Sequence, residues 1–158
     1  MARGGDEPAI TLFEGASVRG QQAMLADLCA RIFDSFDPDY LARRLPLLAD
    51  PVLHVAHGDD GAVLGFKIGY RRGPSLLYSW LGGIVPEARG RGIAARLMQV
   101  QHEWAAAQGY DFVETRTRAS NNRMIIVNLT AGFHIAGVES DEAGHLVVIQ
   151  RRRLNTLP

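Results

Sequence analysis

Residues able to do chemistry are concentrated in one stretch, Gly82-Gly83-Ile84-Val85-Pro86-Glu87-Ala88-Arg89-Gly90-Arg91-Gly92-Ile93-Ala94. An apolar strand pattern runs into a loop of glycine and arginine, and that loop opens a helical pattern. The first N–H groups of a helix point outward at the positive end of its dipole, glycines let a ligand approach the backbone, and arginines donate charge-assisted bonds to phosphate. The stretch therefore predicts a pyrophosphate site; a solvated turn that only caps the helix is the alternative.

Gly82 and Gly83 carry separate information, because glycine inside a strand marks a bulge or a place where another backbone or a ligand comes close. If the pair bulges this strand away from the next parallel strand, backbone N–H and C=O groups face the opening. An extended amide-containing arm could pair there as an additional strand. The predicted ligand is therefore long, with its pyrophosphate at the loop and an amide chain along the strand.

Hydrophobic periodicity predicts the elements that hold this segment. It predicts strands at 10–13, 52–56, 62–70, 76–85, 112–117, 133–138 and 145–151, and helices at 24–36, 40–48, 93–108 and 122–131. Turn-forming residues between the second, third and fourth strands favour an antiparallel meander. The strand, helix, strand order from 76 to 117 favours a right-handed parallel crossover. The expected fold class is α/β, with an α+β mixed sheet.

Length and composition are those of one ordinary folded domain. The chain has 158 residues, of which 47% are apolar and 22% charged, enough to bury a core. We expect a disordered N-terminus at residues 1–8, a single domain at 9–153 and a tail at 154–158.

Charge and cysteine content restrict the environment and the partners. Seventeen basic residues balance seventeen acidic ones, so a general attraction to nucleic acid or to an anionic membrane is not expected. Cys29 is the single cysteine and lies in the apolar stripe of the first predicted helix, which predicts a buried hydrophobe. With no export signal and no apolar run long enough to span a membrane, we expect a cytoplasmic protein. An exposed sheet edge leaves a homodimer open.

Two motifs resemble those of the GNAT superfamily of N-acetyltransferases. The family's pyrophosphate loop reads Arg/Gln-x-x-Gly-x-Gly/Ala, and this chain has Arg89-x-x-Gly92-x-Ala94. Downstream, such proteins carry a segment like Ala-Ser-Asn-x-x-Ala-x-x-x-Tyr-x-x-x-Gly-Phe, and this chain has Ala119-Ser120-Asn121 through Gly132-Phe133 without a gap. The resemblance covers roughly residues 52 to 138.

The resemblance implies a site for acetyl-CoA as cosubstrate and the family's mixed-sheet fold. It places the pantetheine against the backbone of Ile84 and Val85, the pyrophosphate on the loop from Arg89 to Ala94, and Asn121 near the pantetheine arm. It also implies direct transfer, in which an amine attacks the thioester and a strand N–H, such as that of Ile84, stabilises the oxyanion. The acceptor is an unidentified amine of a small molecule or a protein.

Asn128 departs from the family pattern, because many relatives carry a tyrosine there that is thought to protonate the leaving thiolate. An asparagine amide has no titratable proton, although it can donate a hydrogen bond or hold a water. Either the thiolate leaves unaided or another group serves, and Tyr78 and Ser79 are the candidates. An ordinary core aromatic is the alternative for Tyr78.

Other polar residues are expected to have structural or solvated roles. Glu114 could be a base, but an exposed carboxylate or one paired with Arg116 is expected, and Glu87 is expected to be a solvated turn residue. The basic end Arg151-Arg152-Arg153 is expected to be a solvated tail. The five histidines lack metal-ligand spacing and are expected at the surface or in turns, so no metal is implied. They are His54, His57, His102, His134 and His145.

Two other functions remain open. Gly90-x-Gly92-x-x-Ala95 also fits a loose dinucleotide fingerprint, with Glu114 about twenty residues further on. Against a dinucleotide-binding oxidoreductase, the loop starts several residues after its strand, and an antiparallel meander precedes it. A non-catalytic module that binds or senses acyl-CoA is the second alternative, and Asn128 is the residue that supports it.

Overall fold

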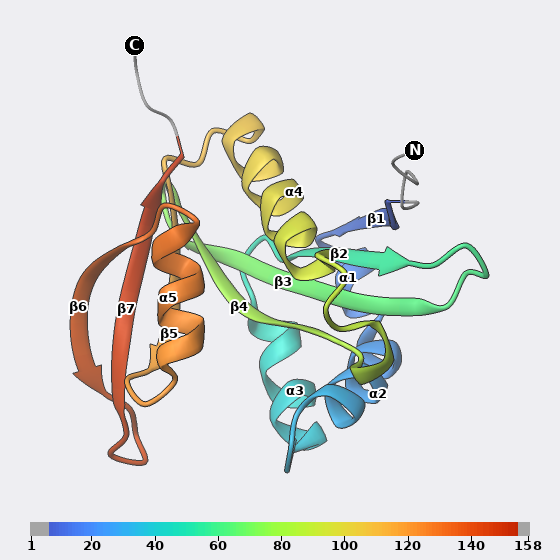
Figure 1. Cartoon of the computed structure of the whole chain (residues 1–158), viewed down its shortest axis with the longest axis horizontal. Coiled ribbons are helices and arrows are strands. Elements are labelled where there is room, and N and C mark those ends of the chain that lie inside the picture. The colour runs from blue at the N-terminus through green and yellow to red at the C-terminus, as the bar shows by residue number, and fades with distance from the viewer. Residues whose placement is uncertain (1–6, 155–158) are drawn as a thin grey trace. The chain divides into compact units, whose positions relative to one another are not determined.

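The computed structural model describes residues 7–154, so the expectations for residues 1–6 and 155–158 lie outside the described residues (Figure 1). The strands are β1 (Ala9–Glu14), β2 (Val52–His57), β3 (Val63–Gly73), β4 (Leu76–Ile84), β5 (Phe112–Arg118), β6 (His134–Ser140) and β7 (Leu146–Arg153). The helices are α1 (Ala16–Arg19), α2 (Gln22–Ile32), α3 (Pro38–Arg44), α4 (Ile93–Ala107) and α5 (Asn122–Thr130), with 3₁₀ turns η1 (Leu45–Leu47) and η2 (Pro86–Ala88).

The strands form a seven-stranded mixed sheet in the order β1-β2-β3-β4-β5-β7-β6. β4 and β5 pair in parallel, whereas β1–β2, β2–β3, β5–β7 and β6–β7 are antiparallel. The predicted mixed α/β fold class and the parallel crossover from β4 through α4 to β5 are confirmed.

The chain forms two compact units. One holds the chain up to Tyr70 together with Leu81–Gln101, and the other holds Arg71–Trp80 together with the chain from His102 onward. β3, β4 and α4 each continue from one unit into the other. The single domain expected at 9–153 stays a prediction.

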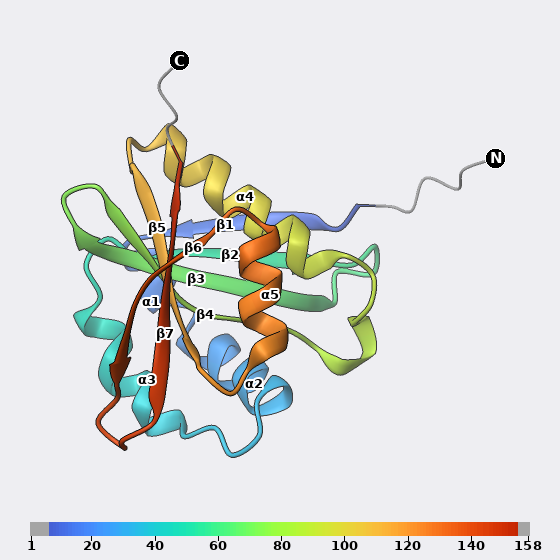
Figure 2. The same ribbon diagram turned by 60° about the vertical axis from the view of Figure 1, so that its left-hand side comes forward.

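In the first unit, helices cover both faces of β2 and β3. The residues of β2 from Val52 to Ala56 are all buried, which requires cover on both sides of the strand. Figures 1 and 2 show α2 and α3 on one side of these strands and the first part of α4 on the other. Leu25, Leu28 and Cys29 of α2 are buried, as the helical spacing predicted.

Local chemistry explains how the helices of this unit begin and end. Pro38 begins α3, and the Asp37 side chain caps it by accepting a hydrogen bond from the Asp39 N–H at 2.9 Å. α2 ends at Ile32, short of the predicted residue 36, because Phe33 adopts an extended backbone and Ser35 has a positive φ of 56°.

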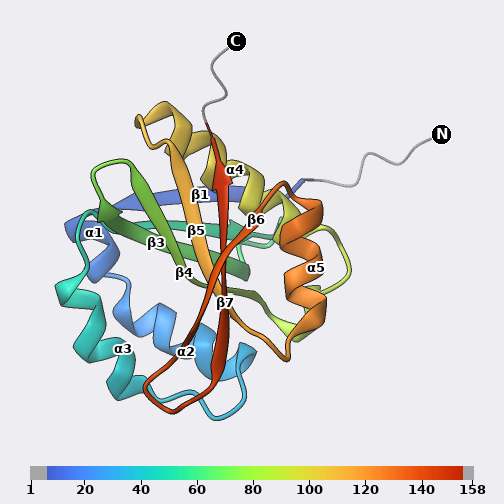
Figure 3. The ribbon, with the colours of Figure 1, turned by 90° about the vertical axis from the view of Figure 1, so that its left-hand side faces the viewer.

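In the second unit, α5 and the last turns of α4 lie on one face of the β5–β7–β6 sheet. Gln150 Nε2 donates to the Ile125 carbonyl of α5 at 3.1 Å, and Arg152 Nη1 lies 2.6 Å from His102 Nδ1 of α4. Figure 3 shows α5 alongside these strands. Arg151, Arg152 and Arg153 belong to β7, so the expectation of a solvated basic tail was wrong: antiparallel pairing with β5 extends to Arg153.

No helix in the described part of the chain combines the length and the apolar composition needed to cross a membrane.

Candidate functional site

The loop between β4 and α4 is built on two glycines in the left-handed region. Gly90 has φ 78° and Gly92 has φ 77°, a conformation that side chains other than glycine adopt only at a cost. No atom of the described residues lies within 4 Å of a Cβ built at either position. The turn is therefore open at both glycines.

The loop presents the N-terminus of α4. The Arg96 N–H bonds to the Gly92 carbonyl at 3.1 Å, which makes it the first i to i−4 bond of the helix. The N–H groups of Ile93, Ala94 and Ala95 therefore precede the helical ladder and have no acceptor within it. Such groups, at the positive end of a helix dipole, form an anion-binding surface.

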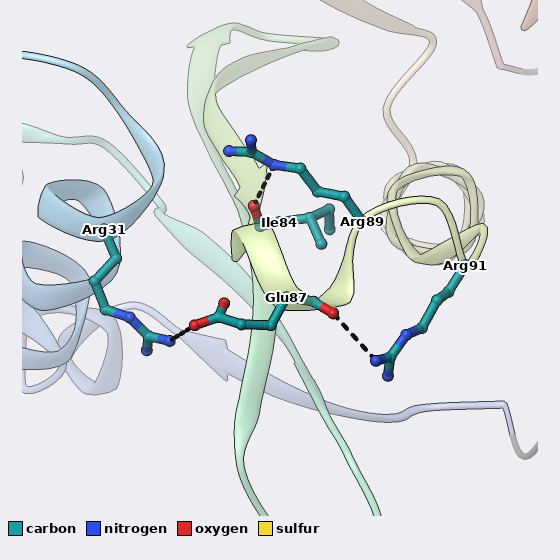
Figure 4. A network of polar contacts seen from close by, with 5 residues as sticks. All are labelled: Arg31, Ile84, Glu87, Arg89 and Arg91. Carbon is teal, nitrogen blue, oxygen red and sulfur yellow. Dashed lines mark hydrogen bonds and ion pairs between the residues drawn. The ribbon is translucent and has the colours of Figure 1, made fainter.

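The two loop arginines brace the loop in this structure. Arg89 donates from Nε to the Ile84 carbonyl at 3.2 Å and from Nη2 to the Ile32 carbonyl at 3.4 Å. Arg91 donates from Nη2 to the Glu87 carbonyl at 3.1 Å. Figure 4 shows the two guanidinium groups turned to opposite sides of the 3₁₀ turn. Their positive charge stays at the loop, but direct phosphate contact by either guanidinium remains a prediction.

Arg31 on α2 is a member of this network that the sequence did not reveal. Its Nη2 lies 3.4 Å from Glu87 Oε1 (Figure 4). The pKa of the exposed Glu87 carboxyl is lowered first by a backbone N–H bond and then by the charge of Arg31. No sequence signal links residues 56 positions apart, because their contact depends on how α2 packs.

Gly83 allows that packing. A Cβ at Gly83 would lie 2.5 Å from Ile32 Cγ2, closer than any normal contact. A Cβ at Gly82 would lie 3.1 Å from the Phe66 carbonyl oxygen. Close approach, one of the two explanations offered for the glycine pair, is therefore observed at both positions, and the bulge stays a prediction.

At the end of β4, neighbouring backbone N–H groups point in opposite directions, one toward β3 and the other away from it. The Val85 N–H donates to the Leu64 carbonyl of β3 at 2.9 Å. N–H groups along a strand point alternately to its two sides, so the Ile84 N–H is directed away from β3. Ile84, but not Val85, therefore keeps an N–H suited to a ligand arm.

In the second unit, the parallel ladder between β4 and β5 is short. It comprises the pairs Leu76–Phe112, Leu77–Val113 and Tyr78–Glu114. The next contact there uses a side chain, because Thr115 Oγ1 donates to the Ser79 carbonyl at 3.3 Å. β5 continues to Arg118 and pairs with β7 on its other side along that whole length.

Glu114 lies at the last pair of this ladder, and its environment differs from the prediction. It is 5% exposed and paired with Arg151, whose Nη2 and Nε lie 2.8 and 3.2 Å from Glu114 Oε2. Arg116 pairs with Glu139 instead. Antiparallel register sets Arg151 directly opposite Glu114, so the expectation of an exposed or Arg116-paired carboxylate was wrong.

Tyr78 and Ser79 also lie at this point. Tyr78 is 8% exposed and Ser79 is 5% exposed. The Arg72 guanidinium lies over the Tyr78 ring, 4.6 Å from its centroid. The proposed catalytic role of either hydroxyl remains a prediction.

Asn121 and Asn128 both have identified hydrogen bonds. Asn121 Oδ1 accepts from the Met124 N–H at 3.2 Å and caps α5. Asn128 is 3% exposed, and its Nδ2 donates to Gln150 Oε1 at 3.0 Å. Gln150 in turn bonds to the Ile125 carbonyl, so this amide pair ties α5 to β7.

Two histidines are buried, contrary to the expectation of surface positions. His54 on β2 is 2% exposed and His102 on α4 is 4% exposed. Burial, followed by the charge of Lys67 opposite it on β3, lowers the pKa of His54 to about 4. Burial lowers the pKa of Lys67 to about 8.

Cys29 is fully buried, as predicted, and burial raises the pKa of its thiol to about 11. The reactive thiolate is therefore disfavoured. No group of three or more His, Cys, Asp and Glu residues suited to a metal ion occurs within residues 7–154.

Solved structures share this fold. The ribosomal-protein-S18-alanine N-acetyltransferase of Escherichia coli aligns with TM-score 0.74 and 13% identity over 95% of this chain and 97% of its own. Spermidine/spermine N-acetyltransferase SpeG of Vibrio cholerae aligns with TM-score 0.70 and 14% identity over 92% of each chain. A candidate streptothricin acetyltransferase of Bacillus anthracis, solved with acetyl coenzyme A, aligns with TM-score 0.60 and 14% identity over 66% of this chain and 63% of its own.

A search of curated proteins yields no match. The model of the acetyltransferase (GNAT) family matches residues 23–133, which include the β4–α4 loop and reach Phe133. Sequence match and shared fold agree, and the chain belongs to the GNAT acetyltransferase family.

Proposed function

We propose that the protein is an N-acetyltransferase that moves the acetyl group of acetyl-CoA to a primary amine. The observation that carries this proposal is the open loop with left-handed Gly90 and Gly92, which presents the first N–H groups of α4. A pyrophosphate binds there through backbone N–H groups, with the positive charge of Arg89 and Arg91 close by. The acetyl-CoA bound by the Bacillus anthracis relative supports this choice of ligand.

The pantetheine arm pairs through its amides with the end of β4, at the Ile84 N–H that points away from β3.

The reaction is a direct transfer. The neutral amine attacks the thioester carbonyl carbon, the new C–N bond forms as the C–S bond breaks, and the amine proton leaves to a base or to water. A backbone N–H of β4 stabilises the oxyanion. Because Asn128 is held by Gln150, Tyr78 is the better candidate for giving a proton to the CoA thiolate.

The test measures thermal stability with acetyl-CoA, CoA or NAD, and then thiol release from acetyl-CoA over an amine panel. We expect acetyl-CoA and CoA to raise the melting temperature, because each binds the native state, and amines to accelerate thiol release. Stabilisation by NAD alone would overturn the proposal in favour of a dinucleotide enzyme. CoA binding without amine-dependent thiol release would indicate the sensing module.

A further inference from the structure

One face of β5 and β7 is rich in arginine. Side chains alternate along a strand, so Glu114, Arg116 and Arg118 share one face of β5. In antiparallel register, Arg151 stands opposite Glu114, and Arg153 stands opposite Phe112. This surface, named here the arginine face, comprises Phe112, Glu114, Arg116, Arg118, Val147, Ile149, Arg151 and Arg153, with Glu139 of β6 beside it.

α5 does not lie on this face. Gln150 and Arg152, the β7 residues of the opposite parity, are the ones that contact Ile125 of α5 and His102 of α4. Within the second unit, the helices therefore occupy the other side of the strands. The arginine face is therefore the side of this unit that its own helices do not contact.

Positive charge exceeds negative charge on this face. Arg151 pairs with Glu114, and Arg116 pairs with Glu139. Arg118 and Arg153 form no ion pair with any residue in 7–154, and both are exposed. The guanidinium groups of Arg151 and Arg153 lie 5.6 and 5.8 Å from the centroid of the Phe112 ring. Each guanidinium retains N–H groups for another ligand, since it has five.

The single buried carboxylate of this face lies at the end of the β4–β5 ladder. Both hydrogen bonds from Arg151 go to Glu114 Oε2, and Oε1 accepts none from the residues of 7–154. An ammonium could bind Oε1 while an oxyanion on the same molecule binds the arginines. Arg153 lies diagonally across from Glu114, two residues beyond Arg151, the direct partner of Glu114 on β7, and such neighbours lie about 7–8 Å apart. That separation fits a compact molecule carrying both charges.

We propose that the acceptor is a zwitterionic amine, whose attacking amino group is accompanied by a nearby carboxylate or phosphate, and that the arginine face binds this anion. The proposal rests on the proposed function. Glu114 holds the amino group, which attacks after it loses a proton, and Arg153, diagonally across from Glu114 on β7, attracts the anion. A polyamine is disfavoured, because its further ammonium groups would face uncompensated guanidinium charge.

The test compares matched pairs of amines that differ in the anion. Thiol release from acetyl-CoA is followed with phenylalanine against phenethylamine, lysine against cadaverine and phosphoethanolamine against ethanolamine, with spermidine as a polycation. We expect kcat/KM at least tenfold higher for the anionic member of a pair. The first two pairs report on a carboxylate and the third on a phosphate. Equal or higher kcat/KM for the decarboxylated amines or spermidine would overturn the inference.

Variants connect the preference to the arginine face. The substitution Arg153→Gln should raise KM for the preferred zwitterion about tenfold and leave KM for the partner amine that lacks the anion unaffected. Arg123→Gln removes one positive charge from an exposed position on α5 and should change neither value. Unchanged KM in Arg153→Gln would contradict the role of this face.

Different results would overturn the proposed function and the inference about the acceptor. If acetyl-CoA neither stabilises the protein nor releases thiol with any amine, the proposed function itself fails. If CoA stabilises the protein but no zwitterion in the panel is acetylated, or cations are preferred, only the inference about the acceptor is overturned.

Discussion

At the scale of single residues, the buried His54 and the half-buried Lys67 opposite it make stability depend on pH. The pKa of His54 is lowered to about 4 and that of Lys67 to about 8, in each case chiefly by burial. For both groups the unfolded chain binds more protons than the folded chain between the two pKa values, so stability rises with pH there. The windows are about pH 4 to 6.5 for His54 and about pH 8 to 10.5 for Lys67.

Lys67→Met is therefore expected to raise the free energy of unfolding at pH 7 by about 1–3 kcal/mol, because it removes a charge held in a poorly solvated position. The rise in stability between pH 8 and 10.5 should flatten. The pKa of His54, read by NMR titration, should move up toward its ordinary value, since one of its two causes is gone. Urea unfolding across pH provides the measurement, and a profile as steep as that of the wild type would contradict the assignment.

Tyr78 is the residue on which the proposed proton transfer depends. Tyr78→Phe keeps the ring under Arg72 but removes the acid, so kcat should fall by about 10²-fold, while the Kd for CoA stays unchanged. Tyr110→Phe is the matched control, because Tyr110 is also buried under an arginine, with Arg71 at 4.6 Å. Steady-state kinetics and calorimetric titration of CoA separate the two effects. Full activity of Tyr78→Phe would exclude the role.

At the scale of secondary-structure elements, the sequence correctly predicted the features that depend on the local pattern of residues. β4, α4 and β5 fall within a few residues of their predicted bounds, and a helix forms at α5 where one was predicted. The short helix α1, the burial of His54 and the pairing of Glu114 with Arg151 were not predicted. Those features depend on which segments contact one another in the folded chain. The spacing of apolar residues carries little information about strand register or helix packing, so it could not predict them.

The contact of α2 with β4 is one such packing feature, and it can be tested at Gly83. Gly83→Ala places a methyl group 2.5 Å from Ile32 Cγ2, and we expect a loss of about 1–3 kcal/mol in the free energy of unfolding. Gly20→Ala is the matched control, because Gly20 has a helical φ of −65° and a Cβ there would lie 3.4 Å from the Ser17 carbonyl oxygen. In an Ile32→Ala background the penalty at Gly83 should shrink. Equal losses at the two glycines in denaturant unfolding would contradict the close approach.

At the scale of the whole molecule, coenzyme binding should add to stability, and this gain should require the β4–α4 loop if the assignment of the pyrophosphate site is correct. A ligand that binds only the native state stabilises it by about 4 kcal/mol at a thousandfold excess over its Kd. That gain should grow with the logarithm of CoA concentration. It provides a measure of binding that does not require turnover and does not depend on the identity of the acceptor.

Gly92→Asp is expected to abolish this gain, because it adds a negative charge and a side chain at the point where the phosphates bind. Gly144→Asp is the matched control: Gly144 also has a positive φ, 84° against 77° at Gly92, and also has no atom within 4 Å of a built Cβ. Both substitutions impose similar backbone strain, so the stability of the two variants without ligand should be similar. Only Gly92→Asp should lose the rise in melting temperature with CoA. A full rise in Gly92→Asp would place the coenzyme elsewhere, whereas loss of the rise in both variants would trace the effect to strain in the fold.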